Sequence, residues 1–331
     1  MGQDISPSTV GVVVIGRNEG ERLRRCLTSL LDDAECIVYV DSGSSDDSVA
    51  MSRGLGVEVV DLDMRTAFTA ARARNEGFWR LLRLRPDLQY VFFVDGDCEV
   101  MPGWLDTATA FLDGHPDVAV VSGLLRERYP EKSIYNLLCN IEWDSFPLGE
   151  TKSCGGNAVM RVGVFRQVNG YRPDMICGEE PELCVRIRQA GWRVWRLKKD
   201  MALHDAALYH FSQWWKRMVR GGYAYAQGAD LHGAPPERHW VQESRRIWLW
   251  GLWVPLGVLA LTAGLGWRAL WFFAVYPLRA VRFAVRERRP AREAWAHAFA
   301  LVLCKFPELL GQLKFMRDKH RRVQSTLIEY K

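Results

Sequence analysis

Four short apolar runs in the first hundred residues, separated by helical patterns, restrict the fold of this chain most strongly. The runs are rich in β-branched and aromatic residues, which predicts buried strands. They are TVGVVVI (9–15), ECIVYV (35–40), VEVVDL (57–62) and YVFFV (90–94). Residues 19–33 carry leucines at helical spacing, and residues 66–86 form a second helical pattern that ends at a proline. This alternation predicts an α/β fold with a mostly parallel sheet flanked by helices.

Polar turns follow three of these runs directly. GRNEG follows the first strand, DSGSSDD the second and DGDCE the fourth. Ligands of open parallel sheets bind beyond the carboxyl ends of the strands. The sequence therefore predicts a ligand site at this edge. Further along, 117–125 predicts another strand, and 155–171 and 178–197 carry helical periodicity.

Asp95 and Asp97 lie one residue apart after a buried strand. Two carboxylates held close together repel each other unless a cation is present, and hard divalent cations prefer oxygen ligands. We expect the pair to hold Mn²⁺ or Mg²⁺, with His204 as a third ligand oriented by Asp205. The alternatives are a helix cap by Asp97, a solvated Asp95 and a structural histidine.

An acidic doublet, Glu179 and Glu180, precedes Pro181 at a predicted helix start. Carboxylates at that position interact favourably with the helix dipole, which is a sufficient structural reason for them. A carboxylate within hydrogen-bond reach of a substrate hydroxyl can also remove its proton as the hydroxyl attacks. Both readings stay open from the residues alone.

Two further groups are candidates for contact with an acceptor. Trp214, Trp215 and Arg217 combine aromatic faces, which suit sugar rings, with a basic group that suits phosphate. Gly156 and Asn157 lie in a GGN turn that can bring backbone amides close to a ligand. Core packing, membrane-interface aromatics and a plain turn are the alternatives.

The C-terminal part differs in character from the rest of the chain. Residues 240–331 hold 16 Lys or Arg against 6 Asp or Glu, whereas the remainder holds 28 against 33. Residues 247–267 contain no charge, and a second apolar run (269–278) has basic flanks. This pattern predicts a helical hairpin over 247–285 with both ends cytosolic, followed by an amphipathic helix over 293–320. The hairpin crosses the bilayer, lies on it, or is a buried core element.

We therefore expect a catalytic domain with the ligand site over 1–230 and a helical membrane-associated region over 231–331. The eight cysteines form no C-x-x-C pair, and MGQDISPSTV does not resemble a signal peptide. These features predict a catalytic domain on the cytoplasmic side of the inner (plasma) membrane. Membrane lipids are expected partners, and nucleic acid is not.

Several blocks together resemble the family 2 glycosyltransferases with the GT-A fold, of the membrane-associated bacterial type. The resemblance covers about residues 9–225 and depends on the order and spacing of the blocks. They are VVVIGRNEGERLRRCLTSL, VYVDSGSSDDSVAMSR, AARARNEGFW, FFVDGDCEVMPGWL, GGNAVMRVGVFRQVNGYRPDM and CGEEPELCVRIRQAGWRV.

The resemblance implies that residues 1–230 form a nucleotide-sugar-binding catalytic domain, and it implies roles for particular residues. Asp95 and Asp97 would hold the metal and the donor diphosphate, and Asp41 would hold the nucleobase. The doublet of Glu179 and Glu180 would supply the catalytic base, with Glu180 in that role. Two departures are Ser42, where many members carry a second Asp, and Glu-Glu in place of Glu-Asp. The implied nucleotide-sugar site comprises Arg17, Asn18, Glu19, Asp41, Ser42, Arg72, Arg74, Asn75, Asp95 and Gly96.

The expected function is therefore an inverting, metal-dependent transfer of a sugar from a nucleotide-sugar to a glycan or lipid-linked acceptor at the cytosolic membrane face. The process would be glycan or polysaccharide assembly. One alternative is a catalytically inactive, membrane-tethered subunit that binds a nucleotide-sugar or a glycan. Another is a nicotinamide or nucleotidyl-transfer enzyme, which is disfavoured because no G-x-G-x-x-G follows the first strand.

Overall fold

The computed structural model describes residues 9–34, 36–323 and 328, so the N-terminal segment used above to predict the absence of a leader lies outside it. The chain divides into two compact units. The first comprises Met1–Arg128 and Glu142–Ala206, and the second Tyr129–Ile141 and Ala207–Lys331. The predicted ranges placed residues 207–230 with the catalytic domain, whereas these residues belong to the second unit.

The first unit is built on a nine-stranded sheet with the order β3-β2-β1-β4-β8-β6-β9-β5, and β7 pairs with β9. The strands β1 to β4 pair in parallel, whereas β8 pairs antiparallel with β4 and β6. The prediction of an α/β sheet flanked by helices is confirmed, with a mixed rather than purely parallel second half. The strands are β1 (Val10–Gly16), β2 (Cys36–Asp41), β3 (Glu58–Asp61), β4 (Tyr90–Asp95), β5 (Cys98–Val100), β6 (Val118–Glu127), β7 (Gly149–Thr151), β8 (Ala158–Arg161) and β9 (Arg193–His204).

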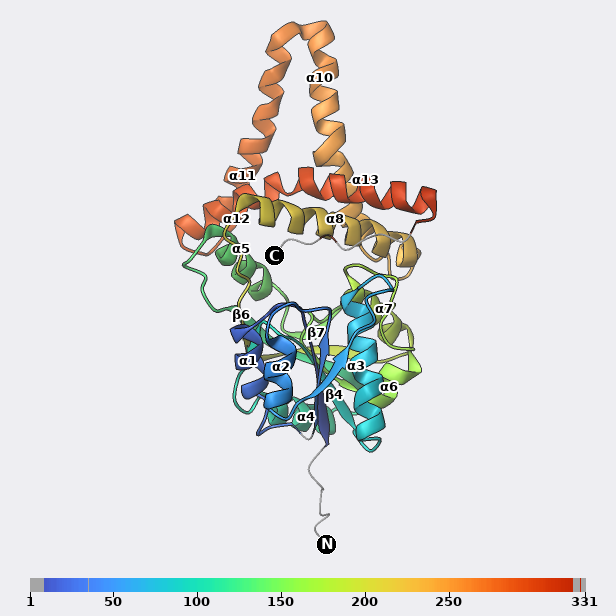
Figure 1. Ribbon diagram of the computed structural model, residues 1–331. Helices are drawn as coiled ribbons and strands as arrows, with labels where there is room; N and C mark the ends of the chain where they lie inside the picture. The colour runs from blue at the N-terminus through green and yellow to red at the C-terminus, as the bar shows by residue number, and fades with distance from the viewer. Residues whose placement is uncertain (1–8, 35, 324–327, 329–331) are drawn as a thin grey trace. The chain divides into compact units, whose positions relative to one another are not determined.

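Helices cover both faces of this sheet (Figure 1). Side chains alternate along a strand, so Val13 of β1 packs with Phe78 and Phe165 on one face, while Val12 and Val14 pack with Leu23 and Trp104 on the other. Both cores are fully shielded from water. The helices are α1 (Glu21–Thr28), α2 (Ser48–Gly54), α3 (Ala70–Leu84), α4 (Trp104–Gly114), α6 (Val162–Gln167) and α7 (Glu179–Gln189).

Two predicted helical segments of the first unit are only partly helical. Residues 158–161 form β8, between β4 and β6, before α6 begins. Residues 193–204 form β9, after α7 ends. A short apolar run such as AVMR can form either a helix or a strand. Here it forms a strand because it pairs with β4 on one side and β6 on the other.

The second unit is helical. The long helix α8 and helix α13 pack backbone to backbone, because a Cβ added at Gly222 would lie 1.9 Å from the carbonyl oxygen of Glu308. The elements are α5 (Ile134–Asp144, whose last residues belong to the first unit), α8 (Phe211–His232), α9 (Val241–Trp248), η1 (Leu249–Trp253), α10 (Val254–Leu265), η2 (Gly266–Ala274), α11 (Val275–Arg286), α12 (Ala291–Leu303) and α13 (Lys305–Arg321).

The predicted hairpin is present as two antiparallel arms, α10 in one and η2 followed by α11 in the other, which Figure 1 shows joined at the tip and spreading apart below it. The chain reverses after Gly266, which has a positive φ of 61°. Near the base of the hairpin the Tyr276 hydroxyl donates to the Trp250 carbonyl at 2.5 Å. The stretch Val241–Arg286 is long and apolar enough to cross a membrane, judged by length and composition only. The predicted amphipathic segment 293–320 is divided at Cys304 into α12 and α13.

Candidate active site

Three loops meet at one edge of the sheet because β1, β2 and β4 end in register. Gly16 pairs with Asp41, and Ile15 pairs with Asp95. The residues that follow these strand ends therefore lie close together, as the sequence predicts.

Asp41 organises the turn after β2. It is buried, its Oδ1 accepts the Tyr39 hydroxyl at 2.8 Å, and its Oδ2 accepts the amides of Gly43 and Ser44 at 3.0 and 2.8 Å. Burial and the neighbouring carboxylate raise the pKa of Tyr39. Ser42 is fully buried, and its hydroxyl has no hydrogen-bond partner within the described part of the chain.

The loop after β1 is tied to the loop after β2. Asn18 has a left-handed φ of 55°, its amide donates to Ser44 Oγ at 2.8 Å, and its Oδ1 accepts the Ser45 amide at 2.7 Å. Arg17 is exposed beside it, and Glu19 pairs with Arg22 at 2.8 Å. Arg17 is therefore an exposed cation at this edge of the sheet.

Arg72 and Asn75, although predicted near the nucleotide, bond to neighbouring loops. The Arg72 guanidinium donates to the carbonyls of Thr66 and Ala67 at 2.7 and 3.1 Å. Asn75 forms a pair of hydrogen bonds with the backbone of Tyr171, at 2.7 and 2.9 Å. Both side chains therefore fix loops that border the site.

Arg74 is the central charge of the site. Its guanidinium is 3% exposed and lies 2.8 Å from Asp95 Oδ1, 2.7 Å from Glu179 Oε1 and 3.1 Å from Glu180 Oε1. Burial disfavours the cation, but the surrounding carboxylates outweigh this effect and raise the pKa of Arg74. Asp95 is thus paired with an arginine in this structure, where a bound cation was expected.

Glu180 combines an unusual pKa with access to solvent. Burial, followed by the charges of Glu179 and Asp95, raises its pKa to about 7, although Arg74 opposes the shift. Its side chain is 16% exposed, whereas that of Glu179 is 3% exposed. Glu179 therefore completes a buried ion pair, and Glu180 is the one that faces outward and can exchange a proton near neutral pH.

The GGN turn lies against these charges. A Cβ added at Gly156 would lie 2.7 Å from Asp95 Oδ2 and 2.9 Å from Arg74 Nη2, so a larger residue would displace these charged groups. Asn157 is buried, its Oδ1 accepts the Asp95 amide at 2.9 Å, and its Nδ2 donates to Cys98 Sγ at 3.0 Å. Gly96 is also close-packed, with its amide donating to the Ile15 carbonyl at 2.8 Å.

Asp97, Cys98 and His204 form a group whose possible ligand atoms all lie within 4.8 Å of one another. Asp97 Oδ1 is 3.3 Å from His204 Nε2, and both side chains are largely buried. An imidazole nitrogen and a carboxylate oxygen that face each other are suitable ligands for a divalent cation. Asp95, predicted as a further ligand, is not in this group.

The orientation of His204 differs from the expectation. Its Nδ1 faces Glu127 Oε2 at 3.7 Å, whereas Asp205 lies 3.8 Å from Arg25. The expectation that Asp205 orients the imidazole is therefore wrong. The cause is strand register, since His204 on β9 pairs with Glu127 on β6 and with Cys98 on β5.

Sequence reasoning did not identify Glu127 and Cys98. Cys98 directly follows Asp97, so its position next to a predicted metal ligand was a usable signal. Glu127 is a charge at the end of an apolar strand, which was a weaker one.

The three aromatic and basic residues predicted on the acceptor side, Trp214, Trp215 and Arg217, belong to α8 in the second unit. Trp214 is buried, with its ring 5.7 Å from that of Phe211 and 6.5 Å from that of Tyr135. Trp215 is half-buried, with its ring 5.5 Å from that of Phe211. The packing of Trp214 matches the core-packing alternative.

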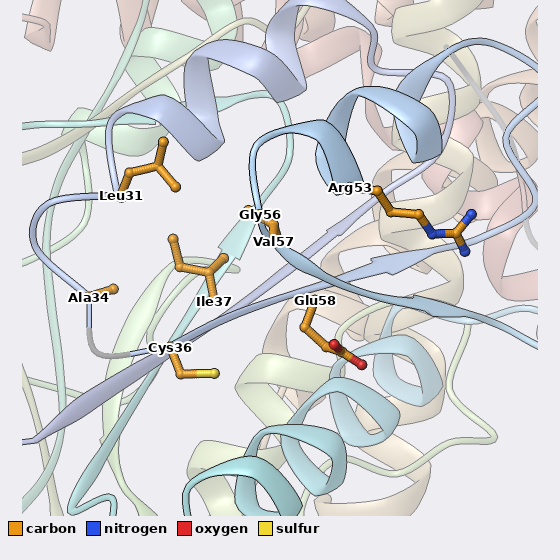
Figure 2. Close-up of a pocket in the computed structure, with 8 residues that line it drawn as sticks. All are labelled: Leu31, Ala34, Cys36, Ile37, Arg53, Gly56, Val57 and Glu58. Carbon is orange, nitrogen blue, oxygen red and sulfur yellow. The ribbon is translucent and has the colours of Figure 1, made fainter.

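A shallow pocket lies at the opposite edge of the sheet, where β2 and β3 begin (Figure 2). Its lining includes Cys36, Ile37, Val57 and Glu58. None of the predicted site residues lines it.

Comparison with known proteins adds independent information. Residues 11–169 match the family model described as Glycosyl transferase family 2. The chain is 29% identical over 214 residues to the pre-mycofactocin glycosyltransferase of Mycobacterium tuberculosis, which covers 59% of this chain but only 42% of that relative. It is 22% identical over 264 residues to glycosyltransferase AglE of Haloferax volcanii, covering 76% of this chain and 81% of the relative.

Two solved structures share the fold. The mannosyltransferase PcManGT from Pyrobaculum calidifontis, in complex with GDP-Man and Mn²⁺, has a TM-score of 0.65 at 18% identity, covering 96% of this chain and 91% of its own. The glucosyl-3-phosphoglycerate synthase of Mycobacterium tuberculosis, in complex with Mn²⁺, UDP-glucose and phosphoglyceric acid, has a TM-score of 0.50 at 17% identity, covering 69% of this chain and 81% of its own.

Proposed function

Because the chain belongs to the family 2 glycosyltransferases, we propose that it transfers a sugar from a nucleotide-sugar donor to an acceptor hydroxyl with inversion at the anomeric carbon. The observation that carries this proposal is the joining of Asp95 and the acidic doublet by one buried arginine, beside the Asp97–His204 pair. A donor-binding edge and a proton acceptor are thereby held next to each other.

The donor would bind at the edge formed by the loops after β1, β2 and β4. Asp41 fixes its turn by three hydrogen bonds, and this turn would form a rigid surface for the nucleobase of the donor. The exposed Arg17 supplies a positive charge toward the diphosphate. Both related structures described above hold nucleotide-sugars, which supports this class of donor.

Mn²⁺ or Mg²⁺ would be held by Asp97 and His204, with Asp95 nearby. The residues fit such an ion because an oxygen and a nitrogen ligand face each other at 3.3 Å in a largely buried position. When bound, the ion offsets the charge that develops on the departing diphosphate. The Mn²⁺ in both related structures supports the same choice of metal.

Glu180 would act as the base. With a pKa of about 7 it is partly ionised at neutral pH, so its carboxylate can accept the proton of the acceptor hydroxyl as that oxygen attacks. Arg74 holds the carboxylate in place through the 3.1 Å contact. Glu179 binds the same guanidinium at 2.7 Å and would hold Arg74 in the position from which it contacts Glu180.

The acceptor would be a lipid-linked molecule or a glycan, and the chain would act at the cytosolic face of the inner (plasma) membrane. Supporting observations come from the second unit by itself, where the arms α10 and α11 expose large apolar side chains and basic residues flank the hairpin. Exposed apolar surface with basic borders suits a bilayer of anionic lipid. Trp215 and Arg217 remain predicted acceptor contacts.

A second candidate is a nucleotide-sugar-binding subunit without catalysis. The observation that favours it is the pairing of both glutamates with Arg74, which would neutralise a base. Tight binding of a nucleotide-sugar without turnover would support this candidate over the first.

A panel of nucleotide-sugars, assayed with Mn²⁺ and a membrane lipid extract, tests the proposal. We expect one donor to release its nucleoside diphosphate and label a lipid-extractable product, whose anomeric configuration by NMR is opposite to that of the donor. A product with retained configuration would contradict the mechanism, and release of the diphosphate without a lipid product would contradict the acceptor class.

A further inference from the structure

Cys98 lies in the same row of the sheet as His204. β9 runs between β6 and β5, so His204 pairs in register with Cys98 on one side and with Glu127 on the other. Directly paired residues place their side chains on the same face of a sheet. The Cys98 sulfur and the His204 imidazole are therefore brought together by strand register, and Asp97 joins them from the preceding turn.

The distances among these atoms suit a small coordination shell. Asp97 Oδ1 lies 3.3 Å from His204 Nε2 and 3.8 Å from Cys98 Sγ. Two ligands at about 2.0–2.1 Å from a tetrahedral Zn²⁺ are about 3.3 Å apart, and a sulfur at about 2.3 Å lies about 3.5 Å from an oxygen ligand. Two of the three spacings are thus close to those of such a shell, and the sulfur and the imidazole nitrogen lie within 4.8 Å of each other.

The sulfur of Cys98 accepts a hydrogen bond from the side chain of Asn157. Its Nδ2 donates to Sγ at 3.0 Å, while its Oδ1 is fixed by the Asp95 amide. This hydrogen bond holds the sulfur beside Asp97 and His204, and binding of a metal itself releases the thiol proton. Cys26, a buried thiol nearby, instead faces the Asp95 carbonyl at 3.7 Å, where it can only donate. Both thiols thus lie beside an oxygen acceptor, which is Asp97 Oδ1 at 3.8 Å for Cys98, and the hydrogen bond from Asn157 is what distinguishes Cys98.

We propose that Cys98 is a third protein ligand of the cation held by Asp97 and His204, which makes this a mixed nitrogen, oxygen and sulfur site that binds Zn²⁺ and Co²⁺ more tightly than Mn²⁺. This inference rests on the proposed function, because it concerns the same cation position. As the metal–sulfur bond forms, the thiol proton leaves to the buffer, and no oxidant or reductant is involved. Thiolate ligands favour Zn²⁺ and Co²⁺ over the harder Mn²⁺ and Mg²⁺.

A consequence follows for activity. Zn²⁺ at low concentration would displace Mn²⁺ from the site, so the activity of the chain would depend on which of the two ions it meets. A site of oxygen and nitrogen ligands alone would discriminate less strongly.

Cobalt spectroscopy on the full chain, stripped of metal by chelation, tests the ligand directly. We expect one equivalent of Co²⁺ to produce a sulfur-to-cobalt charge-transfer band in the near-ultraviolet, and Cys98→Ser to lose it. By calorimetry, Cys98→Ser should weaken Zn²⁺ binding by at least about tenfold and change Mn²⁺ binding by no more than about threefold. Cys36→Ser, at the opposite edge of the sheet, is the matched control and should retain the band.

Stoichiometric binding of Co²⁺ without that band, or a band that persists in Cys98→Ser, would overturn the inference, as would failure of Co²⁺ to bind. In each case Mn²⁺ calorimetry shows separately whether the metal site of the proposed function exists. Circular dichroism of Cys98→Ser, compared with the wild type, shows that a lost band reflects the ligand and not the fold.

Discussion

Nη1 of Arg74 lies 3.1 Å from Oε1 of Glu180, and both side chains are largely shielded from water. The same guanidinium also contacts Asp95 at the end of β4. One cation therefore links the proposed base to the loop that would face the donor diphosphate.

Replacing Arg74 with alanine should destabilise the protein strongly. The change leaves Glu179, Glu180 and Asp95 without their shared counter-charge, and removal of one partner from a buried ion pair typically costs about 3–5 kcal/mol. Urea unfolding measures the loss. Arg80→Ala, which breaks the half-buried pair with Glu58, is the control, with an expected cost of about 0–1 kcal/mol. Equal losses in the two variants would show that Arg74 has no special role.

Activity should rise with pH through about 7. Burial beside other carboxylates raises the pKa of Glu180 to about 7, so the form that accepts a proton predominates only above that value. We expect kcat/KM to increase between pH 6 and 8, at roughly tenfold per unit on the acidic side. In Glu180→Gln, the activity should fall by about 10²–10⁴-fold and this pH dependence should vanish. A variant that kept the wild-type profile would exclude Glu180 as the base.

The raised pKa of Glu180 should also make the folded protein less stable as the pH rises, whereas activity should increase over the same range. The folded chain holds the Glu180 proton more tightly than the unfolded chain, where the pKa is near 4.5. The contribution of this group is therefore fully present below about pH 4.5 and is lost as the pH rises to about 7. Urea unfolding between these pH values should show a smaller decrease in stability for Glu180→Gln than for the wild type. Parallel stability curves would contradict the shifted pKa.

Gly156 and Gly155 provide a matched pair of substitutions. An added Cβ at Gly156 would meet Asp95 and Arg74 at under 3.0 Å, whereas nothing lies within 4 Å at Gly155. We expect Gly156→Ala to reduce kcat/KM by about 10–100-fold through displacement of these side chains, and Gly155→Ala to have little effect. Steady-state kinetics with the donor identified in the panel decides. Similar values for the two variants would mean that the close approach is unimportant.

Glu127 should act as a positioning residue for His204. Metal-binding histidines usually direct their second nitrogen toward a carboxylate or carbonyl, and loss of that partner typically weakens metal binding by about 10–100-fold. Glu127→Gln keeps the shape of the side chain and removes the charge that faces Nδ1. Calorimetry with Mn²⁺ should show this weakening, and Glu99→Gln, at a partly exposed pair with Arg128, should not. Unchanged affinity in Glu127→Gln would leave it a purely structural residue.

The tip of the hairpin should bind lipid. Trp267 and Trp271 are 70% and 73% exposed, which is unusual for tryptophan in contact with water alone. We expect Trp267→Glu/Trp271→Glu to bind vesicles of anionic lipid at least about tenfold more weakly in flotation assays. Trp79→Glu, on an exposed face of α3 in the first unit, is the control. Equal binding of both variants would argue against membrane insertion of the hairpin.

The strands and the ligand edge were predictable because their signals are local. A β-branched run followed by a polar turn, as at Val94 and Asp95, indicates both a buried strand and the place where it ends. The hairpin was predictable for the same reason, since its length without charge is a property of one segment.

The partners across the site were not predictable from one sequence. Glu127 meets His204 only because β6 and β9 pair in a particular register, and Arg74 reaches the acidic doublet from a helix far away in the chain. The ion pair of Asp95 with Arg74 and the contacts of the Trp214 ring with Phe211 and Tyr135 were therefore not foreseen, although Asp95 and Trp214 were named as candidate site residues. These contacts depend on which segments far apart in the sequence pack together, and the hydrophobic periodicity of a single segment does not predict that.

The most direct measurement is release of nucleoside diphosphate from the preferred nucleotide-sugar by the wild type and by Asp97→Ala, with Mn²⁺ and after chelation. The account predicts that chelation abolishes release, that added Mn²⁺ restores it in the wild type, and that Asp97→Ala stays inactive at every Mn²⁺ concentration that supports the wild type. Release that is indifferent to chelation, or an Asp97→Ala variant as active as the wild type, would contradict it.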